Sequence, residues 1–120
     1  MAYSAHIDTF ARDHLPPADQ LPEFLFDLPE LRFPERLNCA SLLLDRHVDE
    51  GRGARVCVRA PDGPVWSYAE LLDKANRIAN VLVHRFGVVP GNRVLLRSAN
   101  KPMLQIAWRA TTCAKATFSI

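Results

Sequence analysis

The sequence predicts an α/β fold in which a β-hairpin and a βαβ unit are flanked by helices. The hairpin is predicted by Arg55–Ala60, which alternates with period two, and by the short apolar stretch Val65–Ser67 that follows a turn. Tyr68–Phe86 repeats apolar residues every three or four positions, as an amphipathic helix does. Arg93–Arg97 and Thr117–Ile120 are apolar stretches on either side of a further helical segment. They therefore predict two parallel strands joined by a crossover helix.

The composition is that of a single globular unit. Of the 120 residues, 48% are hydrophobic and 23% are charged, which argues against disorder. The longest stretch without a charged residue, Leu37–Leu44, is far shorter than the about 20 apolar residues that cross a bilayer, so no membrane partner is expected. The first thirty residues lack the basic start and apolar core of a secretory signal, and we expect a cytoplasmic protein. A reduced compartment also fits three cysteines without a C-x-x-C pair: Cys39, Cys57 and Cys113.

Charge is divided unevenly along the chain. Residues 1–50 hold ten acidic and four basic residues, a balance of −6, whereas the remainder holds eleven basic and three acidic residues, a balance of +8. Such a division fits either a surface for nucleic acid or another anion, or two halves of one fold that face each other. The basic residues are scattered and have no interleaved aromatic residues, which favours the second interpretation. No nucleic-acid partner is therefore expected.

The chain divides into a lead segment, residues 1–36, and an α/β portion, residues 37–120. The lead segment is predicted to be irregular, with one short helix that Ser4 caps and that carries Ile7 and Phe10 on one side. Prolines then alternate with large apolar residues, which prevents long helices while favouring burial. We therefore expect an extended segment lying across a larger body.

The α/β portion is predicted to open with a helix capped by Asn38 and ended by Gly51. In the strand that follows, period two places Val56 and Val58 on one face. Ser67-Tyr68-Ala69-Glu70 has the pattern of a capping box at the start of the long helix, which Gly87 ends.

The last part of the chain predicts the βαβ unit. Val89–Asn92 reads as a turn, and the strand Arg93–Arg97 is expected to be buried on both faces. Asn100 is expected to cap the crossover helix. A hairpin and one βαβ unit supply too few strands to cover both faces of a parallel sheet. We therefore expect an incomplete sheet and a truncated domain, whose uncovered face meets the remainder of a longer protein or a second copy.

The sequence contains no catalytic motif that assigns a reaction. There is no phosphate-binding loop, nucleophile elbow or H-E-x-x-H motif, and Gly51-Arg52-Gly53 precedes a strand, which favours an ordinary loop. Cys57 lies in a predicted strand and is interpreted as a small hydrophobic residue. Ser98 and Asn100 follow the carboxyl end of a strand, where α/β sheets commonly bind ligands, although capping is favoured for Asn100. No histidine has a second metal ligand three or four positions away: His6, His14, His47 and His84. No catalytic, cofactor-binding or metal-binding residue is therefore assigned.

One resemblance points to a reaction. It rests on three stretches: Trp66-Ser67-Tyr68-Ala69-Glu70-Leu71, then Gly87-Val88-Val89-Pro90-Gly91-Asn92-Arg93-Val94, then Asn100. They occur in the order and spacing found in AMP-forming acyl- and aryl-CoA ligases. The chain resembles the amino-terminal region of this adenylate-forming superfamily, which includes luciferase, over about residues 37–108. The resemblance implies the amino-terminal part of the adenylate-forming ligase fold.

Two further features refine the resemblance. The stretches at residues 3–13 and 33–38 look most like those of aminobenzoate- and benzoate-type CoA ligases. Asn92 stands where the family usually has Asp, a change that a turn accepts. Residues 109–115 depart from the usual apolar helix end, and Lys115 occupies the place of a glycine.

The resemblance implies a two-step reaction for an intact family member. A carboxylate attacks ATP to give an acyl adenylate and pyrophosphate, and the thiol of CoA then displaces AMP; Mg²⁺ and basic groups stabilise the phosphates. Family members carry the phosphate loop, the adenine and acyl pockets and the catalytic lysine on later segments, and no residue here matches them. The chain alone is therefore predicted to bind no cofactor and to be inactive, as a scaffold. The alternative is a small non-catalytic interaction or oligomerisation module.

Overall fold

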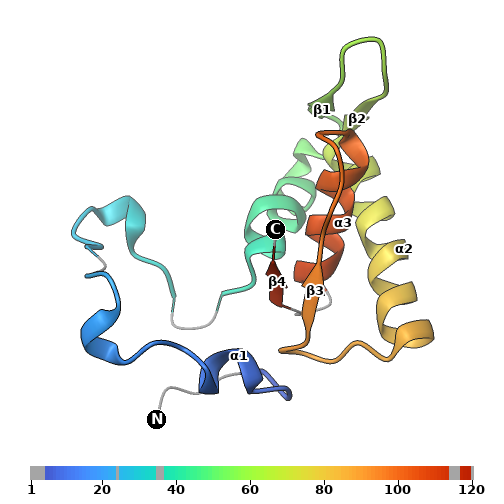
Figure 1. Cartoon of the computed structure of the whole chain (residues 1–120). Helices are drawn as coiled ribbons and strands as arrows, with labels where there is room; N and C mark the ends of the chain where they lie inside the picture. The colour runs from blue at the N-terminus through green and yellow to red at the C-terminus, as the bar shows by residue number, and fades with distance from the viewer. Residues whose placement is uncertain (1–4, 24, 35–36, 114–116, 120) are drawn as a thin grey trace.

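The computed structural model describes residues 5–23, 25–34, 37–113 and 117–119. Figure 1 shows the long helices and the hairpin gathered on one side, with the lead segment forming an arc away from them. The helices and strands are α1 (Phe10–Asp13), β1 (Val56–Arg59), β2 (Val65–Ser67), α2 (Tyr68–Phe86), β3 (Arg93–Leu95), α3 (Pro102–Cys113) and β4 (Thr117–Ser119). Four short helical segments precede β1: η1 (Ala18–Gln20), η2 (Pro29–Leu31), η3 (Ser41–Asp45) and η4 (Val48–Arg52).

Two separate two-stranded sheets form among the described residues. β1 pairs with β2 antiparallel, which confirms the hairpin, and β3 pairs with β4 parallel. Because α3 connects β3 to β4, the βαβ unit is confirmed as well. The α/β class and the incomplete sheet are therefore as the sequence predicts. None of the described helices is both long enough and apolar enough to cross a membrane.

Helix α2 begins and ends where its sequence predicts. The Glu70 amide donates to Ser67 Oγ at 3.3 Å, and the Ser67 amide donates to Glu70 Oε2 at 2.8 Å, so both halves of the capping box form. The backbone bond from Ser67 lowers the pKa of Glu70 and keeps its carboxylate charged. At the other end, Gly87 adopts the left-handed conformation at φ 65°. Glycine reaches this conformation without steric cost, and the helix stops there.

The core lies between η3, α2 and α3. Leu44, Leu71, Ala75 and Ile106 form one buried cluster, against which the hairpin also packs. Ala75, which has no exposed surface, belongs to a row of alanines that continues in a second cluster formed by Ala79 and Ala110. Small side chains let two helix backbones approach closely, and α2 and α3 lie side by side in Figure 1.

The predicted helix after Asn38 is present, although its hydrogen bonding differs. Asn38 Oδ1 accepts from the amide of Ala40 at 2.9 Å, as an N-cap does, and its Nδ2 donates to the carbonyl of Thr112 near the end of α3. Two turns, η3 and η4, are π-helical rather than α-helical. Gly51 interrupts the helix at φ 78°, so its predicted role as terminator is confirmed to within one residue.

One prediction about strand burial is wrong. In β1 the pairing register shifts between Val56 and Val58, and Val56 is exposed whereas Val58 is half-buried. β3 is not buried on both faces, since 74% of Leu95 is exposed. A two-stranded sheet leaves strand faces uncovered, so apolar composition alone did not predict burial here.

The described part of the lead segment is irregular, and its helix is shorter than the sequence predicts. α1 begins at Phe10 after Thr9, so the expected cap at Ser4, which lies outside the described residues, is not the start of this helix. Ile7 precedes the helix and is exposed. The large apolar residues that were expected to be buried are exposed instead: Leu21, Leu25, Phe26, Leu28 and Phe33.

One part of the lead segment does contact the α/β portion. Residues 5–14, which we name the N-terminal clasp, lie against the loop between α2 and β3. The amides of Ile7 and Asp8 both donate to the carbonyl of Pro90, at 2.8 and 3.0 Å. The side-chain amide of Asn92 donates to Asp8 Oδ2 at 2.9 Å. Backbone and side-chain bonds thus hold the clasp to one side of the loop.

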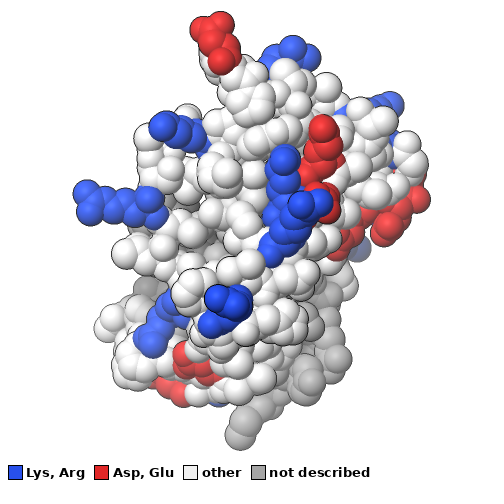
Figure 2. Space-filling model, turned by 90° about the vertical axis from the view of Figure 1, so that its right-hand side faces the viewer, with Lys and Arg blue, Asp and Glu red and all other residues white. Residues whose placement is uncertain are grey.

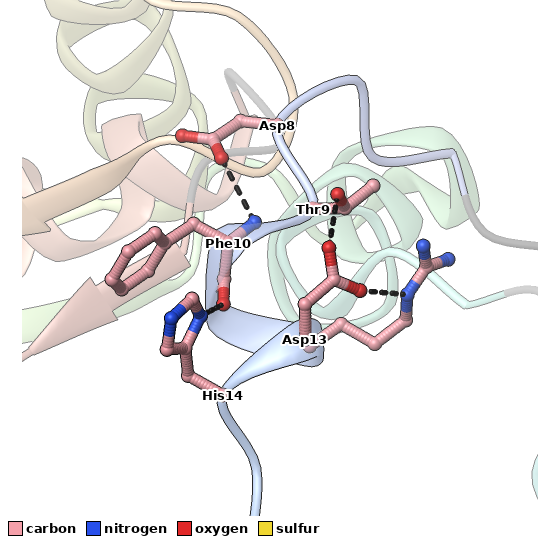
Figure 3. A network of polar contacts seen from close by, with 6 residues as sticks. Asp8, Thr9, Phe10, Asp13 and His14 are labelled. Carbon is pink, nitrogen blue, oxygen red and sulfur yellow. Dashed lines mark hydrogen bonds and ion pairs between the residues drawn. The ribbon is translucent and has the colours of Figure 1, made fainter.

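The clasp is also ordered internally, as Figure 3 shows. Asp8 Oδ1 accepts from the amide of Phe10 at 3.0 Å, and the hydroxyl of Thr9 donates to Asp13 at 2.6 Å. The ring of His14 stacks on that of Phe10 with centroids 3.8 Å apart. These short-range contacts shape the single turn of α1 and keep the Asp8 carboxylate directed at the loop.

The ionisation of Asp8 makes the stability of the clasp depend on pH. The amide of Phe10, and next the side chain of Asn92, hold the pKa of Asp8 below its ordinary value of 3.8. A carboxyl group with a depressed pKa stabilises the folded state at pH values above its ordinary pKa, and this contribution disappears as the pH falls through the lowered pKa. The contribution of the Asp8 carboxylate to the clasp is therefore fully present near neutral pH and is lost in acid.

Asn92→Asp is expected to detach the clasp at neutral pH. Oδ1 of residue 92 would still accept from the amide of Val89, a bond of 2.9 Å, so the loop keeps its shape. The donor to Asp8 is replaced by a carboxylate, however, and two like charges then face each other. Amide hydrogen exchange of Ile7 and Asp8, measured by NMR, is expected to accelerate at least about tenfold.

The control for this prediction is the exchanged pair, Asp8→Asn with Asn92→Asp. An amide at position 8 can donate to the new carboxylate, so the double variant is expected to recover the protection that Asn92→Asp loses. Unchanged protection in the single variant at pH 7 would contradict the role of this bond.

Candidate functional site

A hollow of about 500 Å³ opens between η3, β1 and the amino-terminal ends of α2 and α3. Its volume lies within the range of about 300–1,000 Å³ that small-molecule sites occupy. The helix from Asn38, the hairpin and the crossover helix each supply part of its wall, so residues far apart in the sequence meet there. It is lined by Leu43, Leu44, His47, Cys57, Val58, Arg59, Ala60, Pro61, Tyr68, Leu71, Asn100, Lys101, Pro102, Gln105 and Arg109.

The floor of the hollow is apolar and partly aromatic. Leu44 and Leu71 belong to the buried core and expose little surface. The rings of His47 and Tyr68 lie with centroids 4.3 Å apart at an angle of 31°. Arg52 Nε donates to His47 Nδ1 at 3.1 Å, which leaves the ring proton of a neutral imidazole on Nε2. This bond also fixes the plane of the ring.

The charged side chains that line the hollow are all basic. Arg59 ends β1, Lys101 directly precedes α3 and Arg109 lies further along α3, and no Asp or Glu is among the described lining residues. Glu50, the acidic residue behind His47, forms ion pairs with Arg46 and Arg52. The hydrogen bond from Arg46 is the main reason that the pKa of Glu50 is lowered. The lining therefore has a net positive charge.

Cys57 lies in the wall of the hollow and is half-buried. Burial raises the pKa of its thiol, and the positive charge of Arg109 counteracts only part of this effect. The thiol is therefore protonated at neutral pH and is a poor nucleophile. This agrees with its interpretation as a small hydrophobic residue, and Cys57 packs against the core.

Most of the residues that the sequence offered as candidates for a functional site do not come together in the structure. Of the four histidines only His47 lines the hollow, and no group of three or more potential metal ligands forms within the described part of the chain. Asn100 does not cap α3, which begins two residues later at Pro102; it lines the hollow instead. Ser98 lies outside the hollow, and its hydroxyl donates to the carbonyl of Ala99. Lys115 lies outside the described residues.

The hollow itself was not predicted from the sequence. Its basic residues share no motif and span 50 positions of the sequence: Arg59, Lys101 and Arg109. No sequence pattern links the three residues to one another. The packing of both α3 and the hairpin against α2 brings these side chains to one hollow.

Charge elsewhere is more evenly mixed. Figure 2 views the side on which α2 lies in Figure 1, and there Lys and Arg side chains stand in separate groups with acidic side chains beside some of them. One such pair is Arg77 with Asp73, at 3.0 Å on α2. On this face the described residues form no continuous basic stripe of the kind that binds nucleic acid.

Comparison with known proteins decides the family. Residues 44–120, which include the hairpin, α2, α3 and most of the walls of the hollow, match the family model described as "AMP-binding enzyme". This chain belongs to that family. The AMP-binding match begins at Leu44 and so leaves out the lead segment and its clasp.

Several relatives in the AMP-binding family are acetyl-coenzyme A synthetases. The protein from Burkholderia lata is 45% identical over 64 residues, which is 50% of this chain and 10% of the relative. The protein from Streptomyces coelicolor is 36% identical over 83 residues, 66% of this chain and 12% of the relative. That from Paraburkholderia phymatum is 34% identical over 88 residues, 70% of this chain and 13% of the relative. The chain thus spans little more than a tenth of the length of these relatives.

Proposed function

We propose that this chain forms the amino-terminal scaffold of an AMP-forming carboxylate–CoA ligase. The observation that carries the proposal is the AMP-binding family match over residues 44–120. Named acetyl-coenzyme A synthetases among the relatives support acyl-CoA formation as the reaction of the complete enzyme. In that reaction a carboxylate and ATP give an acyl adenylate, from which CoA takes the acyl group. Such an enzyme would work in the cytoplasm, which stays a prediction.

The described residues do not fit ATP with Mg²⁺. The hollow offers cations for phosphate but no carboxylate for a magnesium ion, and no group of three or more acidic, histidine or cysteine side chains converges elsewhere in the described part of the chain. We therefore derive no catalytic step from these residues. The proposed role is structural: α2 and α3 form a packed support on which other segments of the ligase would carry ATP, Mg²⁺ and CoA.

Two features favour different carboxylic acids as the substrate of the complete enzyme. The printed names of the relatives favour acetate or a similar short acid. The stretches at residues 3–13 and 33–38 resemble benzoate-type ligases and favour an aromatic acid, but the family match does not include them. We keep carboxylic acid as the proposed substrate class, with the aromatic acid as a narrower hypothesis.

Two measurements test the scaffold role together. The 120-residue chain, assayed by ATP–pyrophosphate exchange with acetate and with benzoate, is expected to show no activity above background. In the second measurement, the matching 64 residues of the Burkholderia lata synthetase are replaced by those of this chain, which are 45% identical. The graft is expected to keep adenylation activity, because core positions such as Ala75 and Ile106 would preserve the support.

The intact Burkholderia lata synthetase is the positive control for both measurements. Exchange by the isolated chain would overturn its proposed inactivity. A graft that folds, as judged by circular dichroism and a sharp thermal transition, but does not adenylate would overturn the scaffold role itself.

A second candidate function is an interaction module that associates with a second copy of itself. Its support is the exposure of Leu95 on β3 and Met103 on α3, which the described part of the chain does not cover. Light scattering after size-exclusion chromatography separates the two candidates. A stable dimer together with an inactive graft would favour the module.

A further inference from the structure

We propose that the lead segment of one copy of this chain docks on a second copy, in an apolar groove between the end of β3 and the start of α3. The docking part is residues 25–33, which we name the aromatic knob. This inference rests on the second candidate function, self-association, and names the two surfaces that would meet. It does not depend on the scaffold role. The order of the knob, the size of the groove and the charges of both carry it.

The aromatic knob is an ordered turn whose large apolar side chains face solvent. Backbone hydrogen bonds of 3.0 and 3.2 Å hold the short helix η2 at its centre. The rings of Phe26 and Phe33 lie edge to face with centroids 6.3 Å apart. Because this turn is already formed, little ordering of the chain opposes docking. These apolar side chains of the knob are each more than half exposed, as in a contact surface: Leu25, Phe26, Leu28 and Phe33.

The groove has the size of a side chain rather than that of a free ligand. Its volume is about 220 Å³, below the range of about 300–1,000 Å³ that small-molecule sites occupy. An aromatic side chain that fills an apolar pocket on the partner is a common anchor of protein interfaces. Phe26 is such an anchor on the knob. The apolar wall of the groove is formed by Leu95, Leu96, Met103, Leu104 and Ala107.

The knob and the groove carry opposite charges. Asp27 and Glu30 are exposed on the knob, against one basic residue, Arg32. Arg97 lines the groove, Lys101 is exposed on the loop that joins its two walls, and the described lining residues include no acid. Opposite charges at the edge of an interface orient the partners. They favour a knob in a groove over two grooves face to face, because two grooves would bring like charges together.

The occupant is a second copy because the knob stands away from the groove of its own chain. Figure 1 shows the knob, in cyan, on the arc of the lead segment and well to the left of β3 and α3. The arc is held on both sides: the clasp bonds to the carbonyl of Pro90, and Asn38 donates to the carbonyl of Thr112. Two copies that each place a knob in the other's groove form a closed dimer with two-fold symmetry.

Sedimentation equilibrium of the full 120-residue chain measures the association. We expect a reversible dimer with a Kd of about 100 µM or tighter, since each contact is small but is made twice. A chain that stays monomeric at about 500 µM would overturn both this inference and the second candidate function.

Phe26→Ser with Leu28→Ser tests the knob. The double variant removes exposed apolar anchors and is expected to weaken the dimer at least about tenfold. Leu15→Ser with Leu21→Ser is the matched control, since both leucines are exposed in the lead segment outside the knob. A dimer that persists in the knob variant would overturn the inference while self-association stands. Equal losses in both variants would show unspecific apolar contact and would also overturn it.

Reversal of charge tests the pairing separately. Asp27→Lys with Glu30→Lys is expected to weaken the dimer at least about fivefold, because these residues would then face Arg97. Asp19→Lys with Glu23→Lys makes the same change in net charge on exposed positions of the lead segment outside the knob. Equal losses in the two variants would mean that net charge alone governs association, which would contradict the proposed contact.

Mixing two variants identifies the contact itself. Leu95→Glu with Met103→Glu changes exposed side chains of the groove and is expected to abolish its binding of the acidic knob. In a mixture with the Phe26→Ser, Leu28→Ser variant, an intact knob can still meet an intact groove once per pair. The weight-average mass of the mixture is therefore expected to exceed that of either variant alone. Equal masses, with both variants folded by circular dichroism, would overturn the inference.

Discussion

Gly91→Ala will release the N-terminal clasp from the loop between α2 and β3. A Cβ atom at this position would lie 2.9 Å from the carbonyl carbon of Asp8 and 2.9 Å from Cβ of His6, and it would overlap the Asp8 carbonyl oxygen. Gly91 also has φ +95°, a conformation that L side chains rarely adopt. We expect hydrogen-exchange protection of the Ile7 and Asp8 amides to be lost, by at least about tenfold, because the clasp cannot approach the loop.

Gly87→Ala is the matched control for the clasp. Gly87 has φ +65°, yet a Cβ atom there meets nothing within 4 Å. This variant carries the backbone strain without the steric clash, so it is expected to destabilise the end of α2 by about 1 kcal/mol while the clasp stays docked. If Gly87→Ala also frees the clasp, strain in the loop rather than direct contact is the cause.

Leu44→Ala will destabilise the whole α/β portion. Leu44 is 1% exposed and lies in the cluster with Leu71, Ala75 and Ile106. Truncating a fully buried leucine removes transfer free energy and leaves a cavity, a loss of about 2–5 kcal/mol in the free energy of unfolding. Urea denaturation followed by circular dichroism measures this change.

Leu43→Ala is the matched control, because it makes the same leucine-to-alanine change at the neighbouring position. Leu43 is the sequence neighbour of Leu44 but is 42% exposed, so its truncation is expected to cost less than about 1 kcal/mol. Similar losses at both positions would show that η3 is not packed through Leu44. The comparison also tests the π-helical register, because a shift of one residue would exchange the two side chains.

Helix α2 shows what local sequence can predict. Its start was predictable because Ser67 and Glu70 satisfy each other's backbone amides, and its end because Gly87 adopts a left-handed conformation. Both signals act within a few residues and need no tertiary partner. The hairpin and the βαβ unit were predictable for a similar reason, since their turns carry their own sequence signals.

Burial along the strands was not predictable in the same way. Val56 and Leu95 are apolar residues in strands, yet both are exposed. A register shift in β1 and the absence of a covering layer on β3 decide their environment, and neither is encoded in the local pattern. The predicted start of the short helix in the lead segment was wrong as well. This helix begins at Phe10 because Asp8 and Asp13 accept local hydrogen bonds there.

The hollow and the clasp depend on contacts between distant residues, and no local pattern predicts either of them. Asn92 illustrates the difficulty. It departs from the Asp that is usual in similar ligases, and a turn tolerates both residues. The structure supplies the reason for Asn: its amide donates to the carboxylate of Asp8, where a second carboxylate would be repelled. Such a reason becomes visible only when both partners are placed.

The separation between these two partners has a consequence for how the chain acquires its structure. Asp8 and Asn92 are 84 positions apart, so their bond closes a long loop of the chain. The hairpin and α2 assemble from neighbours and lose little chain entropy, whereas this closure loses much more. During synthesis on a ribosome, residues 5–14 must therefore wait, unattached, until the loop that carries Asn92 has emerged.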